Sequence, residues 1–141
     1  MVVRTRNPEV DKLRRAIVEL LIANHHVDCR HCPKTGHCEL QRIMAYLHVS
    51  AKRMRPLRLP KVELPKDTSS PFFDYDPNKC VLCGICVRTC ESKQGVSALQ
   101  FMGRGYSAKI AFFGDDSRCE SCGECVVRCP VGVLISKTPR Q

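Results

Sequence analysis

The chain has 141 residues, of which eleven are cysteine and none is tryptophan, so thiol ligands are abundant and aromatic core material is scarce. This composition excludes a fold that depends on one large hydrophobic core, and it favours two small modules stabilised by metal sites. The formal charge of +9 would fit a nucleic-acid-binding protein. However, thiolate ligands are negatively charged, so metal sites built on these cysteines would offset much of this positive charge.

The N-terminal segment carries charged residues throughout and shows no export signal. Its longest apolar stretch, residues 16–23, contains Glu19 and is far shorter than the ~20 residues that span a bilayer. We therefore expect a cytoplasmic protein without a transmembrane segment. Thiols stay free to bind metals in that reducing compartment, and an odd number of cysteines disfavours a closed set of disulfides.

The first predicted element is an amphipathic helix over residues 8–23, with Asn7 as N-cap and Pro8 as its first residue. Apolar residues at helical spacing predict a stripe that packs on a partner, formed by Val10, Leu13, Ile17, Leu20 and Leu21. A second helix is expected over residues 39–48. Its apolar face would consist of Leu40, Ile43, Met44 and Leu47.

Candidate metal ligands lie between these two helices. Cys29, Cys32 and Cys38 lack a fourth thiolate, and the nearest alternative is an upstream histidine. His25 is chosen because the spacing H-x3-C-x2-C-x5-C leaves room for a turn before Cys29. A zinc site with the same four ligands remains open from the spacing. The histidines that compete with His25 on spacing alone are His26, His31 and His37.

A linker is predicted for residues 51–77, because its prolines favour extended chain over helix. The stretch is also basic. A solvated or partner-docked strap is favoured over a segment that binds RNA or lipid headgroups.

The C-terminal part, residues 78–141, contains an internal repeat, CxxCGxCVxxC, that begins at Cys80 and again at Cys119. Duplication at this scale predicts a domain with pseudo-two-fold symmetry. Between the repeats we expect strands over residues 96–102 and 109–113, joined by a turn at 104–106. Gly84 and Gly123 supply the permissive backbone that a loop folded over a cluster needs.

Each repeat is a C-x2-C-x2-C-x3-C run, in which the first three cysteines bind one cluster and the fourth binds the other. This crossed ligation predicts two sets of ligands: Cys80, Cys83, Cys86 and Cys129 for one cluster, and Cys90, Cys119, Cys122 and Cys125 for the other. A zinc site does not require four cysteines within eleven residues, and this chain contains two such runs.

Eleven cysteines and one histidine make twelve ligands, which is the number that three [4Fe–4S] clusters need. No thiol remains for a catalytic nucleophile or a CxxC redox pair. We therefore expect no catalytic residue in this chain. The expected fold class is α+β, with a helical His/Cys cluster module over residues 1–50 followed by a bacterial dicluster-ferredoxin-like domain.

The N-terminal motifs RTRNPEV, RRAIVELLIANHHVDCRHC and GHCELQ resemble the region after the [2Fe–2S] domain in the large iron–sulfur subunit of bacterial complex I. They are also similar to parts of [FeFe]-hydrogenases, NAD-dependent formate dehydrogenases and electron-bifurcating relatives. This resemblance implies that His25 ligates a [4Fe–4S] cluster. Residues 78–135, with NKCVLCGICVRTCESKQGVSALQF, RGYSAKI and CGECVVRCPVGVL, resemble the dicluster domain that follows in hydrogenases and formate dehydrogenases.

Members of these families usually carry a [2Fe–2S] domain before this region and, where they are catalytic, a molybdenum or H-cluster domain after it. The sequence runs from Met1 to Gln141, so both domains are expected to be absent. The resemblance then implies a non-catalytic relay subunit of an oxidoreductase complex, which passes single electrons between a flavin–NAD(P) module and a hydrogenase, formate dehydrogenase or similar partner. The alternatives are a free ferredoxin-like carrier and, more remotely, a zinc- or nucleic-acid-binding protein; no nucleic-acid partner is expected.

Overall fold

The computed structural model describes residues 2–51, 63–113, 119 and 121–137. The chain divides into two compact units, Met1–Val62 and Glu63–Gln141. Each unit carries its own share of the predicted ligands, so each is described separately.

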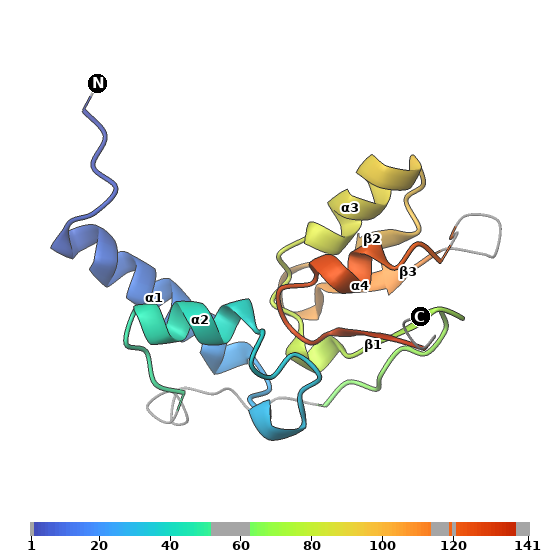
Figure 1. Ribbon diagram of the computed structural model, residues 1–141, viewed down its shortest axis with the longest axis horizontal. Helices are drawn as coiled ribbons and strands as arrows, with labels where there is room; N and C mark the ends of the chain where they lie inside the picture. The colour runs from blue at the N-terminus through green and yellow to red at the C-terminus, as the bar shows by residue number, and fades with distance from the viewer. Residues whose placement is uncertain (1, 52–62, 114–118, 120, 138–141) are drawn as a thin grey trace. The chain divides into compact units, whose positions relative to one another are not determined.

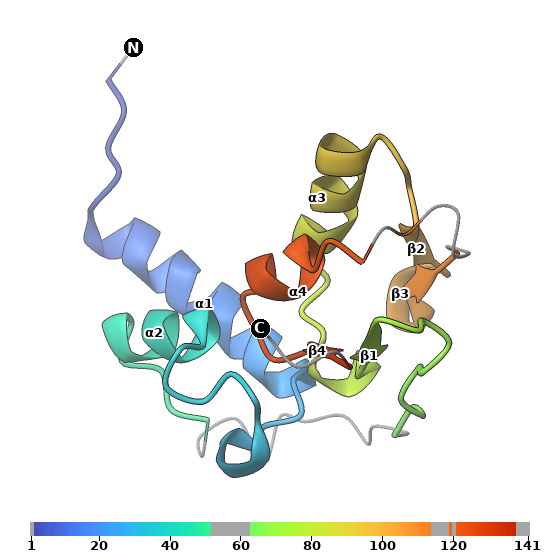
Figure 2. The ribbon, with the colours of Figure 1, turned by 45° about the vertical axis from the view of Figure 1, so that its right-hand side comes forward.

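Unit 1 contains α1 (Pro8–Asn24), a 3-10 turn (Cys29–His31) and α2 (Glu39–Tyr46), and the two helices lie side by side (Figures 1 and 2). The predicted start of α1 is confirmed, because the Asn7 side chain accepts a hydrogen bond of 2.7 Å from the Val10 N–H and Pro8 opens the helix. The second helix ends two residues earlier than predicted. His48 takes a φ of 54°, in the left-handed region, which stops the helical hydrogen-bond pattern there.

The predicted apolar stripe of α1 is not packed within unit 1. Leu13, Ile17 and Leu20 are 65%, 58% and 67% exposed. The residues that α1 buries are Val18 and Ile22, one helical turn apart on a neighbouring face. The core of this unit is small and consists of Val18, Ile22, Leu40, Leu47 and Val49. Hydrophobic periodicity identified the helix correctly, whereas packing selected only a narrow part of its apolar surface.

Unit 2 is built from two antiparallel strand pairs and two helices. β1 (Phe73–Tyr75) pairs with β4 (Leu134–Ser136), and β2 (Leu99–Met102) pairs with β3 (Lys109–Phe112). Helix α3 (Ile85–Gln94) packs against α4 (Glu124–Arg128). Figure 2 shows β1 beside β4 and the two helices next to each other. These contacts bring the first cysteine repeat next to the second.

Residues 63–77 of the expected linker are grouped with the second unit and contain β1. Asp67 also forms an antiparallel bridge with Tyr75, with N···O distances of 2.8 and 2.9 Å. The alternation of buried Phe73 and Tyr75 with half-buried Asp74 stabilises a strand despite the nearby prolines. Residues 52–62 of the expected linker lie outside the described part of the chain.

The strands expected between the repeats are confirmed in type and place. They form β2 and β3, with register from Leu99 opposite Phe112 to Met102 opposite Lys109, and a 3-10 turn (Gly105–Ser107) connects them. Phe73 and Phe112 meet edge to face, with ring centroids 5.6 Å apart. The mixture of helices and small sheets agrees with the predicted α+β class. Among the described helices, none is both long and apolar enough to cross a membrane.

Candidate iron–sulfur sites

The two cysteine repeats share left-handed backbone at two corresponding positions. Leu82 and Ser121 have φ values of 53° and 52°, and Gly84 and Gly123, the N-caps of α3 and α4, both have a φ of 69°. Non-glycine residues rarely adopt positive φ, and such strained positions concentrate at functional sites. The shared conformation curls each CxxCGxC segment before the helix that follows it.

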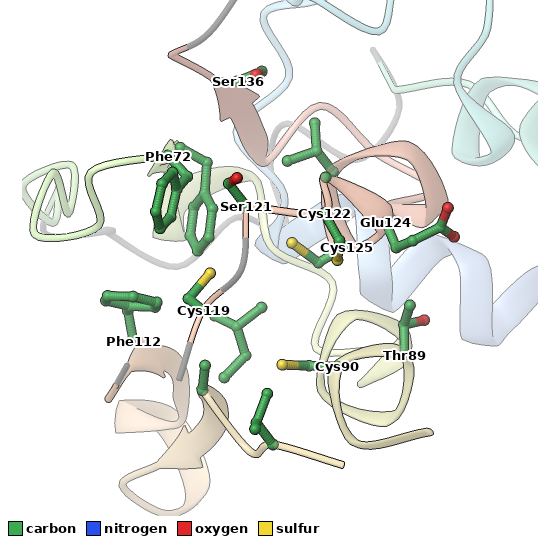
Figure 3. A pocket seen from close by; sticks show the side chains of 16 residues that line it. Phe72, Thr89, Cys90, Phe112, Cys119, Ser121, Cys122, Glu124, Cys125 and Ser136 are labelled. Atoms are coloured by element: carbon green, nitrogen blue, oxygen red, sulfur yellow. The ribbon is translucent and has the colours of Figure 1, made fainter. Parts of the chain in front are cut away.

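Four cysteines line a cavity of about 150 Å³ between the second loop and α3, and we call this the Cys119 site. Figure 3 shows their side chains facing the same space. One comes from α3, and the others come from the loop and first turn of α4. Apolar groups line much of the remaining wall, which keeps the local dielectric low. The four cysteines are Cys90, Cys119, Cys122 and Cys125.

The other four cysteines of the repeats line a second cavity, which we call the Cys80 site. Its volume is about 20 Å³, so it is narrower than the Cys119 site. Cys83 is exposed and forms part of its wall. The structure therefore brings together both of the crossed sets. The cysteines of this site are Cys80, Cys83, Cys86 and Cys129.

The thiols of both sites need a cation to become thiolates. Burial, followed by the charge of neighbouring cysteines, raises the pKa of Cys86 and of Cys125 to about 12. Burial also raises the pKa of Cys80 and of Cys119. An iron–sulfur core supplies positive charge to four thiolates at once, so this donor set fits such a group. No group of three or more His, Cys, Asp or Glu in the described residues is arranged to hold a single metal ion.

Backbone N–H groups point at a sulfur in each loop. The Leu82 N–H donates to Cys80 Sγ at 3.4 Å, and the Ser121 N–H forms the corresponding hydrogen bond with Cys119. The positive φ of Leu82 and Ser121 accompanies these bonds. Such bonds stabilise the negative charge on a cluster's sulfur ligands. The repeat thus supplies both the thiolates and their first hydrogen-bond donors.

The third predicted set lies on the connection between the helices of unit 1. His25 is the C-cap of α1, Cys29 begins the 3-10 turn and Cys38 is the N-cap of α2. His25 and the three cysteines, Cys32 included, are all half-buried. This set lines neither of the two cavities described above. Its four residues have in common that they lie on the connection from the end of α1 to the start of α2.

The competing histidines have different surroundings from His25. His26, His31 and His37 are exposed. In addition, the Nδ1 atom of His31 lies 2.9 Å from a carboxylate oxygen of Asp28, with which it pairs. A cluster ligand has to be shielded from water on at least one side, so burial favours His25.

One residue that the sequence reasoning missed is Tyr75. It lines the Cys80 site, and its hydroxyl forms a hydrogen bond with Cys80. No ligand spacing marks this position, because a tyrosine five residues before a cysteine belongs to no metal motif. Only the pairing of β1 with β4 brings it to the site.

Comparison with known proteins identifies both units. The family described as the NADH-ubiquinone oxidoreductase-G iron-sulfur binding region matches residues 14–53, and a 4Fe-4S dicluster domain matches residues 79–133. The G 2 subunit of the NADH-quinone oxidoreductase of Rhizobium meliloti is 40% identical over 139 residues, which are 96% of this chain and 16% of that protein. The alpha subunit of the NADPH-Fe(3+) oxidoreductase of Geobacter sulfurreducens is 35% identical over 136 residues, with the same shares covered.

A solved structure agrees with these relatives. The crystal structure of an NAD+-reducing [NiFe]-hydrogenase in the H2-reduced state superposes with a TM-score of 0.78 at 28% identity, and the match covers 96% of this chain and 60% of that one. The chain spans only 16% of the length of the two relatives named above. The resemblance inferred from the sequence is confirmed for these two regions: residues 14–53 match the NADH-ubiquinone oxidoreductase-G iron–sulfur binding region, and residues 79–133 match a 4Fe–4S dicluster domain.

Proposed function

We propose that the chain is the electron-relay region of a multisubunit NADH- or NADPH-linked oxidoreductase and that it holds three [4Fe–4S] clusters. One observation carries the proposal: each of two cavities is lined by four cysteines, three from one repeat and one from the other. That crossed arrangement is the ligand pattern of two-cluster ferredoxins. The names of the relatives support the proposal that the chain belongs to a complex, because they describe subunits of NADH- and NADPH-linked oxidoreductases.

In this proposal the chain's own residues hold, shield and tune the redox groups. The Cys80 and Cys119 sites each provide four thiolates, and His25 with Cys29, Cys32 and Cys38 provides the third set. When bound, the clusters supply one-electron redox chemistry. A neutral histidine in place of a thiolate removes one negative charge, which raises the potential of that cluster relative to an all-thiolate one.

The two loops with matching φ values support a pseudo-two-fold relation between the halves of the dicluster domain. We propose that the cluster modules comprise residues 1–50 and 78–141, with β1 completing the second. The proposed partners are a flavoprotein that binds NAD(P) and a catalytic subunit such as a hydrogenase or formate dehydrogenase. Eleven free thiol ligands also fit a reducing compartment such as the cytoplasm.

The metal content tests the cluster count directly. The full chain, purified without oxygen, is expected to contain about twelve irons and as many acid-labile sulfides. About eight of each would remove the third cluster from the proposal. Zinc without acid-labile sulfide would contradict the redox function altogether.

Size-exclusion chromatography of native extract tests the relay role. Co-elution with a large flavoprotein that oxidises NADH or NADPH is expected. A lone species near 15.9 kDa would instead favour a diffusing ferredoxin-like carrier.

A further inference from the structure

The Cys80 site contains a hydroxyl donor that the repeat does not explain. Tyr75, at the end of β1, is 4% exposed and lines this cavity. Its hydroxyl oxygen accepts a hydrogen bond of 3.2 Å from the Ile110 N–H of β3. The same hydroxyl is hydrogen-bonded to Cys80. Since the oxygen already accepts from Ile110, its own proton is directed at the cysteine.

The direction of this bond follows from the chemistry of the ligand. A cysteine that binds iron is a thiolate, which has no proton and can only accept. An ordinary tyrosine phenol has a pKa of about 10, so it keeps its proton at neutral pH. Tyr75 and Ile110 lie in buried positions, whereas Cys83 forms the exposed wall.

Among the described residues that line the Cys119 site there is no tyrosine, and the hydroxyl groups there belong to Thr89, Ser121 and Ser136. The aromatic side chains in its wall are Phe72, Phe73 and Phe112, which lack a hydroxyl. In the sequence, the residue five positions before the first cysteine is Tyr75 in the first repeat and Gly114 in the second. The backbone donors of Leu82 and Ser121 are common to both loops and do not distinguish the sites.

A positively charged side chain adds to this difference in hydrogen-bond donors between the two sites. The Arg88 guanidinium donates to the Cys83 carbonyl oxygen at 3.0 Å, and the second repeat has Val127 at the matching position. The neighbouring Arg128 instead pairs with Glu124 at 3.1 Å. Reduction makes the ligand sulfurs more negative, and hydrogen bonds to charged acceptors are stronger than those to neutral ones. Donors at one site therefore favour reduction there.

We propose that the Tyr75 hydroxyl is a hydrogen-bond donor that sets the reduction potential at the Cys80 site above that of the Cys119 site. An electron that enters the pair then resides preferentially at the Cys80 site. Tyr75 is a positioning residue rather than an iron ligand. The inference rests on the proposed cluster ligation of both sites.

The first test is Tyr75→Phe in the full chain, loaded with iron and sulfide, with reduction followed by EPR in a potentiometric titration. The midpoint potential of one cluster is expected to become more negative. Its reduced-to-oxidised ratio at fixed ambient potential should fall about tenfold, which is 59 mV for a one-electron couple. The matched control is Tyr106→Phe, at a position 71% exposed, which should leave every potential unchanged.

A second measurement separates hydrogen bonding from packing, because Tyr75→Phe also removes the acceptor of the Ile110 N–H. The protein contains three tyrosines, so 3-fluorotyrosine incorporated into a Tyr46→Phe, Tyr106→Phe background labels Tyr75 alone. The more acidic phenol donates more strongly while its oxygen still accepts. The potential of the same cluster should now become more positive.

Opposite shifts from the two changes support the proposal. The proposal is overturned if both changes shift the midpoint potential in the same direction, or if neither shifts it in a protein with all clusters loaded. Either result leaves the proposed function intact. If Tyr75→Phe does not load, the fluorotyrosine measurement decides the question by itself. Unaltered protein with no iron at the dicluster domain would contradict the proposed function, and this inference with it.

Discussion

At the scale of single residues, local chemistry explains why the ligands lie where they do. In a regular helix, the cysteines of a C-x2-C-x2-C run would lie along one side of the helix and would not surround a common space. Left-handed backbone at Leu82, Gly84, Ser121 and Gly123 supplies the necessary bends. Burial distinguishes His25, the half-buried C-cap of α1, from the exposed histidines near it.

His25→Ala is expected to remove or strongly alter one EPR signal of three and to lower the iron content by up to about four per chain, because the third set loses its only nitrogen ligand. EPR and iron analysis of the anaerobically purified chain measure this. His37→Ala, at an exposed position of the same connection, is the matched control and should leave all three signals. The opposite pattern would assign the nitrogen ligand to His37.

Gly84→Ala is expected to destabilise unit 2 more than Gly123→Ala. Both positions have a φ of 69°, so an added Cβ costs about 1–2 kcal/mol at either one. At Gly84 the Cβ would also meet the Phe101 ring at 3.0 Å and the Arg88 guanidinium at 2.9 Å, whereas at Gly123 it meets nothing within 4 Å. Urea unfolding of the two variants measures the difference, and equal free energies of unfolding would contradict it.

At the scale of secondary structure, the periodicity of α1 predicted a helix but not its buried face. Ile22 is 1% exposed, whereas Ile17, which the predicted stripe includes, is largely exposed. Within unit 1, α1 buries Val18 and Ile22 only. The apolar spacing in the sequence contains no information on which part is covered.

Ile22→Ala is therefore expected to lower the free energy of unfolding by about 2–5 kcal/mol, because it leaves a cavity in a small core. Ile17→Ala removes the same atoms from an exposed position and should change stability by less than about 0.5 kcal/mol. Thermal unfolding followed by circular dichroism compares the two. A larger effect at Ile17 would restore the predicted stripe as the packing face.

At the scale of the whole molecule, burial of thiols couples stability to pH and to metal loading. The pKa of Cys86 and of Cys125 is raised from 9.0 to about 12 mainly by burial, so folding favours their protonated forms. Their contribution to stability is complete below the unfolded pKa. It is lost as the pH rises toward the folded pKa.

The metal-free protein is thus expected to lose stability between about pH 9 and pH 12, the window set by these two thiols. Urea unfolding under reductant at pH 8 and at pH 10.5 measures this loss. A Cys86→Ser, Cys125→Ser variant removes the two titrating groups and should lose less stability over the same range. An equal loss in the variant would assign the pH dependence to other groups.

The sequence alone predicted which repeat cysteines line each of the two cavities, the helices of unit 1 and the strands β2 and β3. These features depend on local spacing, which the chain carries in its own order of residues. Tertiary structure decided which face of α1 is buried, that residues 63–77 join the second unit, and that Tyr75 reaches Cys80. Each of these depends on contacts between segments far apart in the chain, as when β1 pairs with β4 across about sixty residues, and spacing within one segment cannot encode such contacts.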